Sequence, residues 1–109
     1  MFTGLTLRFL KEFAVALWLT FPLFLSLAVI ISLLGQIVGK KEAWSRFEAF
    51  YWSFVTATTV GYGDFHPLKR GSRVLAIVIA LLGLTLTGIL VAIAVHAGTI
   101  ALGETQSAR

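Results

Sequence analysis

The 109-residue sequence contains no cysteine and few charged residues. Without cysteine, the chain can form neither a disulfide nor a thiolate metal site. Charged residues make up 13% of the chain, against about 25% in typical soluble domains. Hydrophobic residues make up 58%, and the mean hydropathy is +0.91. This composition excludes a single small soluble domain and indicates a membrane protein.

The formal net charge of +4 is the feature that would favour a nucleic-acid partner. The nine Lys and Arg residues, however, are scattered around apolar runs instead of forming one cluster. Such a pattern is typical of the solvated flanks of membrane helices. We therefore expect a lipid bilayer as the partner and no nucleic acid.

Two long runs carry no charge, and about 20 apolar residues suffice to cross the core of a bilayer. They predict an outer transmembrane helix over 14–38 and an inner one over 73–99. The apolar positions within 1–13 share one helical face, which predicts a short interfacial helix. The polar residues 39–44 predict an exposed loop.

A shorter element is predicted between the two spans. Ser45 and Glu48 have the spacing of a capping box, and the helix that they begin, over 45–57, is too short to cross a bilayer. The next residues, 58–64, contain two glycines, which permit positive φ. Alternating left- and right-handed residues would turn successive carbonyls to one side. Irregular backbone at membrane depth occurs only inside protein or along a water-filled cavity, so 58–64 predicts a lined pathway.

The five residues at the centre of this segment resemble the selectivity filter of potassium channels, whose four loops replace the hydration shell of the ion with carbonyl oxygens. We call them the filter string: Thr59, Val60, Gly61, Tyr62 and Gly63. The resemblance is to the two-transmembrane, one-P-loop pore domain of prokaryotic potassium channels, and it extends over nearly the whole chain. It implies an all-α membrane protein with one pore domain over 1–109, in which two transmembrane helices hold a re-entrant pore helix (45–57) and a selectivity-filter loop (58–64). It also implies assembly as a homotetramer.

The resemblance assigns roles around the filter string. K⁺ is expected at the oxygens of Thr59, Val60, Gly61 and Tyr62. Trp52 is expected to bond the Tyr62 hydroxyl, and Tyr51 is expected to bond the carboxylate of Asp64. On the inner helix, the family pattern places Leu84, Thr87, Val91 and Val95 toward the central axis.

Two further residues of the inner helix have competing interpretations. Gly83 occupies the place of the family's hinge glycine, but small residues also let transmembrane helices approach closely; for Gly88 we favour close packing. His96 lies near the gate, and histidine titrates near physiological pH. Protonating four clustered imidazoles would favour an open pore; the alternative is that His96 faces lipid headgroups or a neighbouring helix and senses nothing.

The resemblance implies passive, selective K⁺ conduction, in which no bond is made or broken. We therefore expect no enzymatic activity and no cofactor, with K⁺ as the permeant ion. Two alternatives stay open: a non-selective cation channel of the same architecture, against which Tyr62 argues, and a non-conducting accessory subunit. No voltage-sensor helix or ligand domain is recognisable, so the gating stimulus is undetermined.

The resemblance implies a plasma (inner) membrane location with both termini in the cytoplasm. Lys and Arg are usually enriched on the cytoplasmic side, and here the charge count disagrees. Six lie between the two uncharged runs and three toward the termini: Lys40, Lys41, Arg46, Lys69, Arg70 and Arg73 against Arg8, Lys11 and Arg109. We give the filter string precedence because its sequence is the more specific signal.

Overall fold

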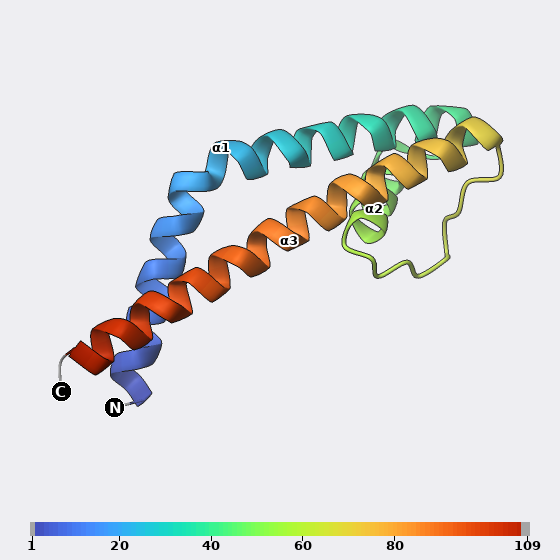
Figure 1. The fold of residues 1–109 in the computed structure, drawn as a ribbon. Coiled ribbons are helices and arrows are strands. Elements are labelled where there is room, and N and C mark those ends of the chain that lie inside the picture. The colour runs from blue at the N-terminus through green and yellow to red at the C-terminus, as the bar shows by residue number, and fades with distance from the viewer. Residues whose placement is uncertain (1, 108–109) are drawn as a thin grey trace. The chain divides into compact units, whose positions relative to one another are not determined.

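The computed structural model describes residues 2–107, with side chains through residue 103; residues 1, 108 and 109 of the predicted domain lie outside the described residues. The described chain has three helices (Figure 1). They are α1 (Phe2–Glu42), α2 (Arg46–Ala57) and α3 (Arg70–Ser107). The chain divides into two compact units: unit 1 comprises Met1–Leu23 and Gly88–Arg109, and unit 2 comprises Phe24–Thr87.

Both long helices, α1 and α3, are long and apolar enough to cross a membrane. Only 6% of the most apolar window of α1 and 11% of that of α3 is buried. A core helix of a soluble protein would be mostly buried, whereas these helices leave large apolar side chains exposed along their length. The two predicted spans therefore lie on helices suited to a lipid environment.

Several threonine hydroxyls within the two long helices find partners inside their own helix. Thr20, Thr85 and Thr99 each donate to the carbonyl four residues earlier, at 2.7, 3.0 and 2.9 Å. A hydroxyl in hydrocarbon has no water to bond, so this internal pairing lets polar residues lie in a spanning helix.

The α1 helix continues further than the sequence predicted. No break separates residues 2–13 from 14–38, and the expected loop over 39–44 is wrong for its first four residues, which are helical as far as Glu42. Tertiary packing explains the extension, because Val38 and Gly39 are buried in unit 2. Two lysines in the last turn also suit the negative end of the helix dipole.

The end of α1 is a left-handed turn. Ala43 has φ of 60°, and the amide of Trp44 donates to the carbonyl of Gly39 at 2.9 Å. This is the six-to-one bond of a Schellman motif, with alanine where glycine is usual. The turn directs the chain from α1 back into α2.

The core of unit 2 draws on all three helices. Its buried members are Ile31 and Val38 of α1, Trp52 and Ala57 of α2, and Ile79 of α3. Lipid is as apolar as these side chains, so close van der Waals contact is what holds such helices together in a bilayer. The closeness of the van der Waals contacts between the helices therefore decides how firmly α2 is held.

The closest contacts of unit 2 involve a line of small residues along α2. We call Ala49, Ser53 and Ala57 the small face; each is at most 1% exposed. A Cβ built on Gly39 would lie 2.5 Å from the Ala49 Cβ, and one built on Gly35 would lie 2.5 Å from the Ser53 Cβ. On α3, a Cβ built on Gly83 would lie 2.0 Å from the carbonyl oxygen of Ala57. Glycine is thus required at three positions for α2 to sit against its neighbours.

Unit 1 pairs the first part of α1 with the last part of α3. Phe9 and Phe13 stack with ring centroids 5.7 Å apart. A Cβ built on Gly98 would lie 3.9 Å from the Phe9 ring, which is ordinary van der Waals contact. Ala97 and Ala101 of α3 are fully buried. Small residues again mark where the helices touch.

Candidate functional site

The site is positioned by α2. The predicted capping box is confirmed: the Ser45 hydroxyl accepts from the Glu48 amide at 3.1 Å, and the Glu48 carboxylate accepts from the Ser45 amide at 3.2 Å. The reciprocal bonds fix the start of the helix. At the other end, Thr58 is the C-cap, and its amide donates to the Phe54 carbonyl at 2.9 Å. The filter string begins at the next residue.

The backbone of the filter string alternates in hand. Thr59, Gly61 and Gly63 have φ of 66°, 56° and 82°, whereas Val60 and Tyr62 between them do not have positive φ. This is the alternation that would turn successive carbonyl oxygens to one side.

Thr59 is strained. A β-branched residue with positive φ is a true outlier, and such conformations cost about 1–3 kcal/mol and persist only where the surroundings enforce them. Two amides are held by the last turn of α2: that of Thr59 donates to Thr56 at 3.1 Å, and that of Gly61 donates to Val55 at 3.2 Å. These two hydrogen bonds hold the start of the string, where it leaves α2.

The string is uncovered within one chain. All five of its residues are exposed, including Val60 at 52% and Tyr62 at 70%. A Cβ built on Gly61 or Gly63 would meet nothing within 4 Å. Val60 and Tyr62 are large apolar or aromatic side chains, and their exposure indicates a surface that another molecule or lipid covers.

The predicted bond between Trp52 and Tyr62 does not form within one chain. Trp52 is 4% exposed and packs in the core of unit 2 against Trp44, with ring centroids 5.3 Å apart. Tyr62 instead extends from the string, and none of the hydrogen bonds between described residues joins the two side chains. The Trp52 side chain is instead part of the hydrophobic core of unit 2.

Tyr51 and Asp64, the other predicted pair, do influence each other. The pKa of the Tyr51 phenol is raised above its ordinary value of 10.0, first by desolvation and then by hydrogen bonding and Coulombic interaction with the Asp64 carboxylate. A nearby negative charge disfavours the phenolate. The neutral phenol, which can donate a hydrogen bond, is therefore favoured over the phenolate.

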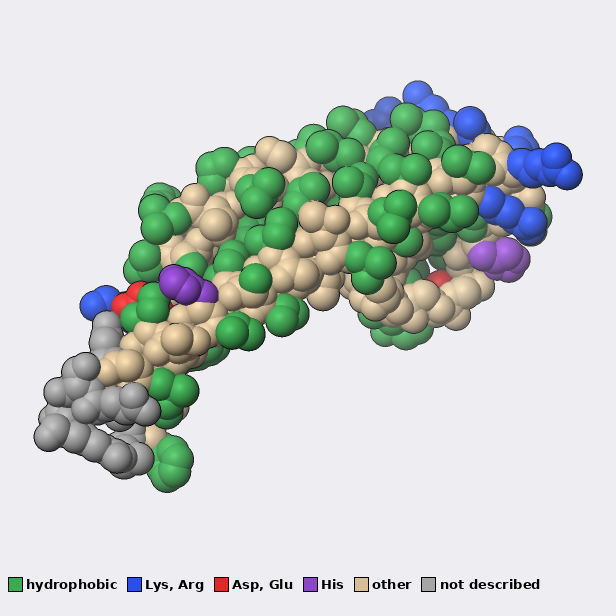
Figure 2. Space-filling view, viewed as in Figure 1, with side chains coloured by type: hydrophobic (Ala, Val, Ile, Leu, Met, Phe, Trp, Pro, Cys, Tyr) green, Lys and Arg blue, Asp and Glu red, His purple; other side chains and the backbone are tan. Residues whose placement is uncertain are grey.

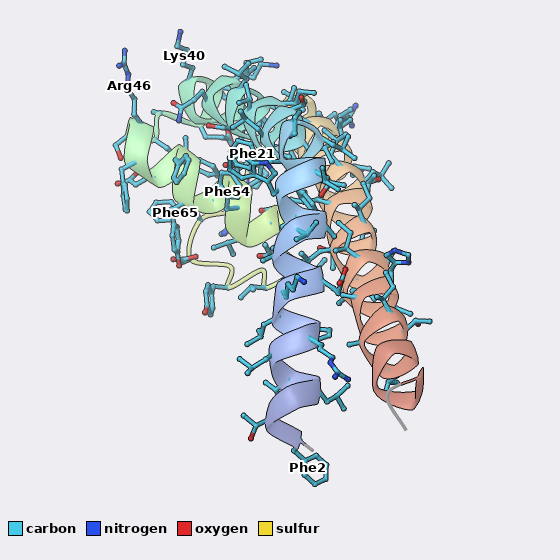
Figure 3. The ribbon with its side chains drawn as sticks, turned by 90° about the vertical axis from the view of Figure 1, so that its left-hand side faces the viewer. Phe2, Phe21, Lys40, Arg46, Phe54 and Phe65 are labelled. Atoms are coloured by element: carbon cyan, nitrogen blue, oxygen red, sulfur yellow. The ribbon has the colours of Figure 1, made fainter. Side chains whose placement is uncertain are left out.

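The chain leaves the string through the return loop, residues 64–69. Its Phe65 ring packs edge-on against Trp44 and Tyr51, with centroids 5.6 and 6.3 Å apart, and lies beside α2 (Figure 3). A ring nitrogen of His66 is 3.2 Å from the carbonyl oxygen of Gly63. Gly63, the last residue of the string, is therefore held by the return loop that follows it.

The predicted residues of the inner helix all lie on α3. Gly83 is buried against Ala57, so of its two interpretations the structure supports close packing. Gly88, for which the sequence favours close packing, makes no such contact within the described chain, because a Cβ built there would meet nothing within 4 Å. In unit 2, Leu84 is 54% exposed, and Thr87 is exposed without a hydrogen bond to the described residues.

The remaining predicted gate residues belong to the part of α3 in unit 1. Val91 and Val95 are 56% and 64% exposed. His96 is exposed as well. None of the three is therefore packed away inside one chain, and all are available to a partner.

Two features of the site were missed in the sequence. The first is the pairing of Gly35 and Gly39 with the small face; their four-residue spacing is a known signal of close helix packing. The second is Glu42, assigned to a loop, whose carboxylate accepts from the amides of Leu68 and Lys69. No local pattern connects Glu42 with residues 26 and 27 positions later.

Comparison with known proteins places the chain among channels. A family described as ion channel matches residues 13–99. The chain is 44% identical over 69 residues to TWiK family of potassium channels protein 7 of Caenorhabditis elegans, which covers 61% of this chain and 12% of that protein. It is 46% identical over 57 residues to the putative potassium channel protein YugO of Bacillus subtilis, which covers 46% of this chain and 17% of that protein.

A third relative is a voltage-gated potassium channel of Aeropyrum pernix, 43% identical over 47 residues, covering 43% of this chain and 16% of that protein. The chain thus spans less than a fifth of the length of each of these relatives. No solved structure matches it.

Proposed function

Because the chain belongs to the ion channel family, and the relatives described above are named potassium channels, we propose that it forms a potassium-selective pore. Four copies surround one axis, and each contributes one filter string. K⁺ is the transported ion, held in turn by the oxygens of Thr59, Val60, Gly61 and Tyr62, and it passes down its gradient. Closely spaced weak sites let one ion displace the next.

The observation that carries this proposal is the alternating backbone of the filter string. Positive φ at Thr59, Gly61 and Gly63 matches what a column of carbonyl oxygens requires. The string also follows the carboxyl end of α2, where the helix dipole favours a cation. Together these features supply oxygens and a favourable field without any charged side chain.

Assembly of several copies is supported by the exposure of the string. One loop presents its oxygens from one direction only, so a single chain encloses no ion. Exposed Val60 and Tyr62 supply apolar surface for neighbouring copies. On α3, the exposed Leu84 and the free hydroxyl of Thr87 suit a water-filled cavity below the filter.

The decisive test is ion flux through purified protein in liposomes. Potassium should pass and sodium should be largely excluded, and Tyr62→Asp should reduce that preference. Equal flux of both ions through the unmutated protein would support the non-selective channel instead. No flux, together with cross-linking that stops below a tetramer, would support the accessory subunit.

We place the protein in the plasma (inner) membrane with both termini in the cytoplasm. The basic side chains between the spans gather at the end of unit 2 where α1 ends and α3 begins (Figure 2). Reporter fusions at Lys41 and at Arg109, the latter outside the described residues, decide the orientation. A cytoplasmic reporter at Lys41 would contradict the placement.

A further inference from the structure

Gln36 brings an amide side chain into an otherwise apolar part of α1. The chain has only two side-chain amides, those of Gln36 and Gln106, and it contains no asparagine. Gln36 lies within the uncharged run over 14–38. An amide without a hydrogen-bond partner is costly at membrane depth, because hydrocarbon offers no acceptor. The partner that this amide finds therefore indicates what Gln36 does.

The partner of Gln36 belongs to α2. Its Nε2 donates at 3.0 Å to the backbone carbonyl of Arg46, the first residue of α2. Arg46 is labelled at the start of that helix in Figure 3. Hydrogen bonds from polar side chains to a neighbouring helix are one of the forces that hold membrane helices together. This bond joins α1 directly to the helix that carries the filter string.

The bond from Gln36 is not needed for α2 to be helical. A carbonyl oxygen has two lone pairs, and in an α-helix one of them accepts from the amide four residues later. The capping box of Ser45 and Glu48 already closes the amino end of α2. Gln36 therefore uses the second lone pair of the Arg46 carbonyl, and its bond acts between helices.

Gln36 adds direction to a contact that is otherwise made by small residues. Its neighbours Gly35 and Gly39 pack closely on Ser53 and Ala49 of the small face. Van der Waals contact of this kind sets how near α2 lies to α1, but the attraction itself has no preferred direction. A hydrogen bond requires a particular distance and angle between donor and acceptor. The Gln36 bond thus constrains how α2 is turned and how far it is advanced along α1.

The constraint at Arg46 reaches the filter string through α2. This helix has 12 residues, and the string begins two residues after its end. The amides of Thr59 and Gly61 donate to carbonyls in its last turn, at 3.1 and 3.2 Å. A displacement of the helix relative to α1 is therefore passed to the start of the string.

From these contacts we propose that Gln36 is a positioning residue for potassium selectivity, which holds α2 so that the filter string starts at one defined place. This proposal rests on the proposed function. Gln36 does not touch the ion; it acts through the Arg46 carbonyl and α2. Without its bond, α2 takes up more than one position, and the oxygens of the string discriminate less between potassium and sodium.

The test is the ratio of potassium to sodium permeability, measured from reversal potentials of the purified protein in planar bilayers. Gln36→Leu has no donor, and its ratio should fall about fivefold, which corresponds to ~1 kcal/mol, an ordinary hydrogen bond. Leucine is favourable in hydrocarbon, so the thermal unfolding midpoint should be unchanged or higher. A ratio that falls only together with the midpoint would show a general loss of stability and would overturn the proposal.

Two further variants test whether the donated hydrogen bond is what matters. Gln36→Lys keeps a donor on a side chain of similar length, so it should lose less selectivity than Gln36→Leu. A loss as large as that of Gln36→Leu would count against donation and overturn the proposal. Gln106→Leu is the matched control, because it removes the other side-chain amide, and its permeability ratio should equal that of the unmutated protein.

Solid-state nuclear magnetic resonance keeps the proposal testable if the Gln36 variants fail to assemble. In Gln106→Leu, Gln36 is the single glutamine, so its side-chain nitrogen can be labelled with ¹⁵N and the arginine carbonyls with ¹³C. A dipolar coupling between the two labels should appear, because the bond brings Nε2 close to the Arg46 carbonyl.

The outcomes separate the role of Gln36 from the proposed function. No dipolar coupling, or an unchanged permeability ratio in Gln36→Leu of a potassium-selective channel, would overturn the role of Gln36. An unmutated protein that does not select potassium would instead overturn the proposed function.

Discussion

The two sides of α2 differ in side-chain size and in exposure. The small face, Ala49, Ser53 and Ala57, is buried against glycines of α1 and α3. A neighbouring side, which we call the aromatic face, consists of Phe47, Phe50 and Phe54; Phe47 is 75% exposed and Phe50 47% exposed. One short helix thus has one side that is closely packed and a neighbouring side that the described chain leaves largely uncovered.

We relate the small face to the positioning of α2 and the filter string, and the aromatic face to the assembly of several copies of the chain. Small side chains have no rotamers to adjust, so contact through them fixes α2, and with it the start of the filter string, within narrow limits. Large aromatic side chains supply contact area, and here they line a cavity of about 380 Å³ that also includes Val60 and Tyr62. The aromatic face is continuous with the string, as expected of a surface that neighbouring copies cover.

Breaking the small face should have the largest effect. In Gly83→Ala the new Cβ meets the backbone carbonyl of Ala57 at 2.0 Å, and backbone cannot rotate aside. We expect the free energy of unfolding in detergent to fall by about 3 kcal/mol, the upper range for overpacking, as measured by circular dichroism.

Gly88→Ala is the matched control on the same helix, since its new Cβ meets nothing within 4 Å. Alanine is the better helix former by about 1 kcal/mol, so this variant should be as stable as the unmutated protein or more stable. Equal losses in both variants would show that Gly83 acts through flexibility and not through contact.

Truncating the aromatic face should affect assembly more than folding. Phe50→Ala removes a ring that is half exposed in one chain. If copies pack on it, the association free energy should fall by roughly 1–2 kcal/mol per copy, as for other buried aromatic anchors, with little change in helix content. Cross-linking yield measures the tetramer, and Phe2→Ala, an exposed phenylalanine of unit 1, should leave that yield unchanged.

The smallest expected effect concerns Tyr51, which lines the same cavity as the aromatic face. Tyr62→Phe leaves Tyr51 as the single tyrosine of the chain, so phenolate absorbance then reports its pKa, which should lie above 10.0. Because the pKa of Tyr51 is raised in the folded state, its protonated phenol adds to the stability of that state. This contribution is complete below pH 10 and declines as the pH rises through the folded-state pKa. Asp64→Asn should lower the pKa by removing the charge; an unchanged titration would show that Asp64 does not act on Tyr51.

Much of the site could be predicted from contiguous residues. The filter string, the capping box at Ser45 and Glu48, and the two apolar runs are local patterns whose physical meaning needs no knowledge of the fold. The glycines at 61 and 63 also predicted backbone with positive φ at those positions. The sequence alone therefore predicted four helical segments and an irregular loop; in the structure the first two are one continuous helix, α1, and α2, α3 and the string lie where they were expected.

Tertiary structure decided how these parts are held. The continuation of α1 through Glu42 depends on packing in unit 2, and the burial of Gly83 against Ala57 and the hydrogen bonds from Leu68 and Lys69 to Glu42 each join residues distant in the chain. Local sequence is compatible with more than one outcome at these points: a polar stretch can be loop or helix end, and a glycine can be hinge or contact. Close packing selects between them, because the space left at each position depends on the neighbouring helix.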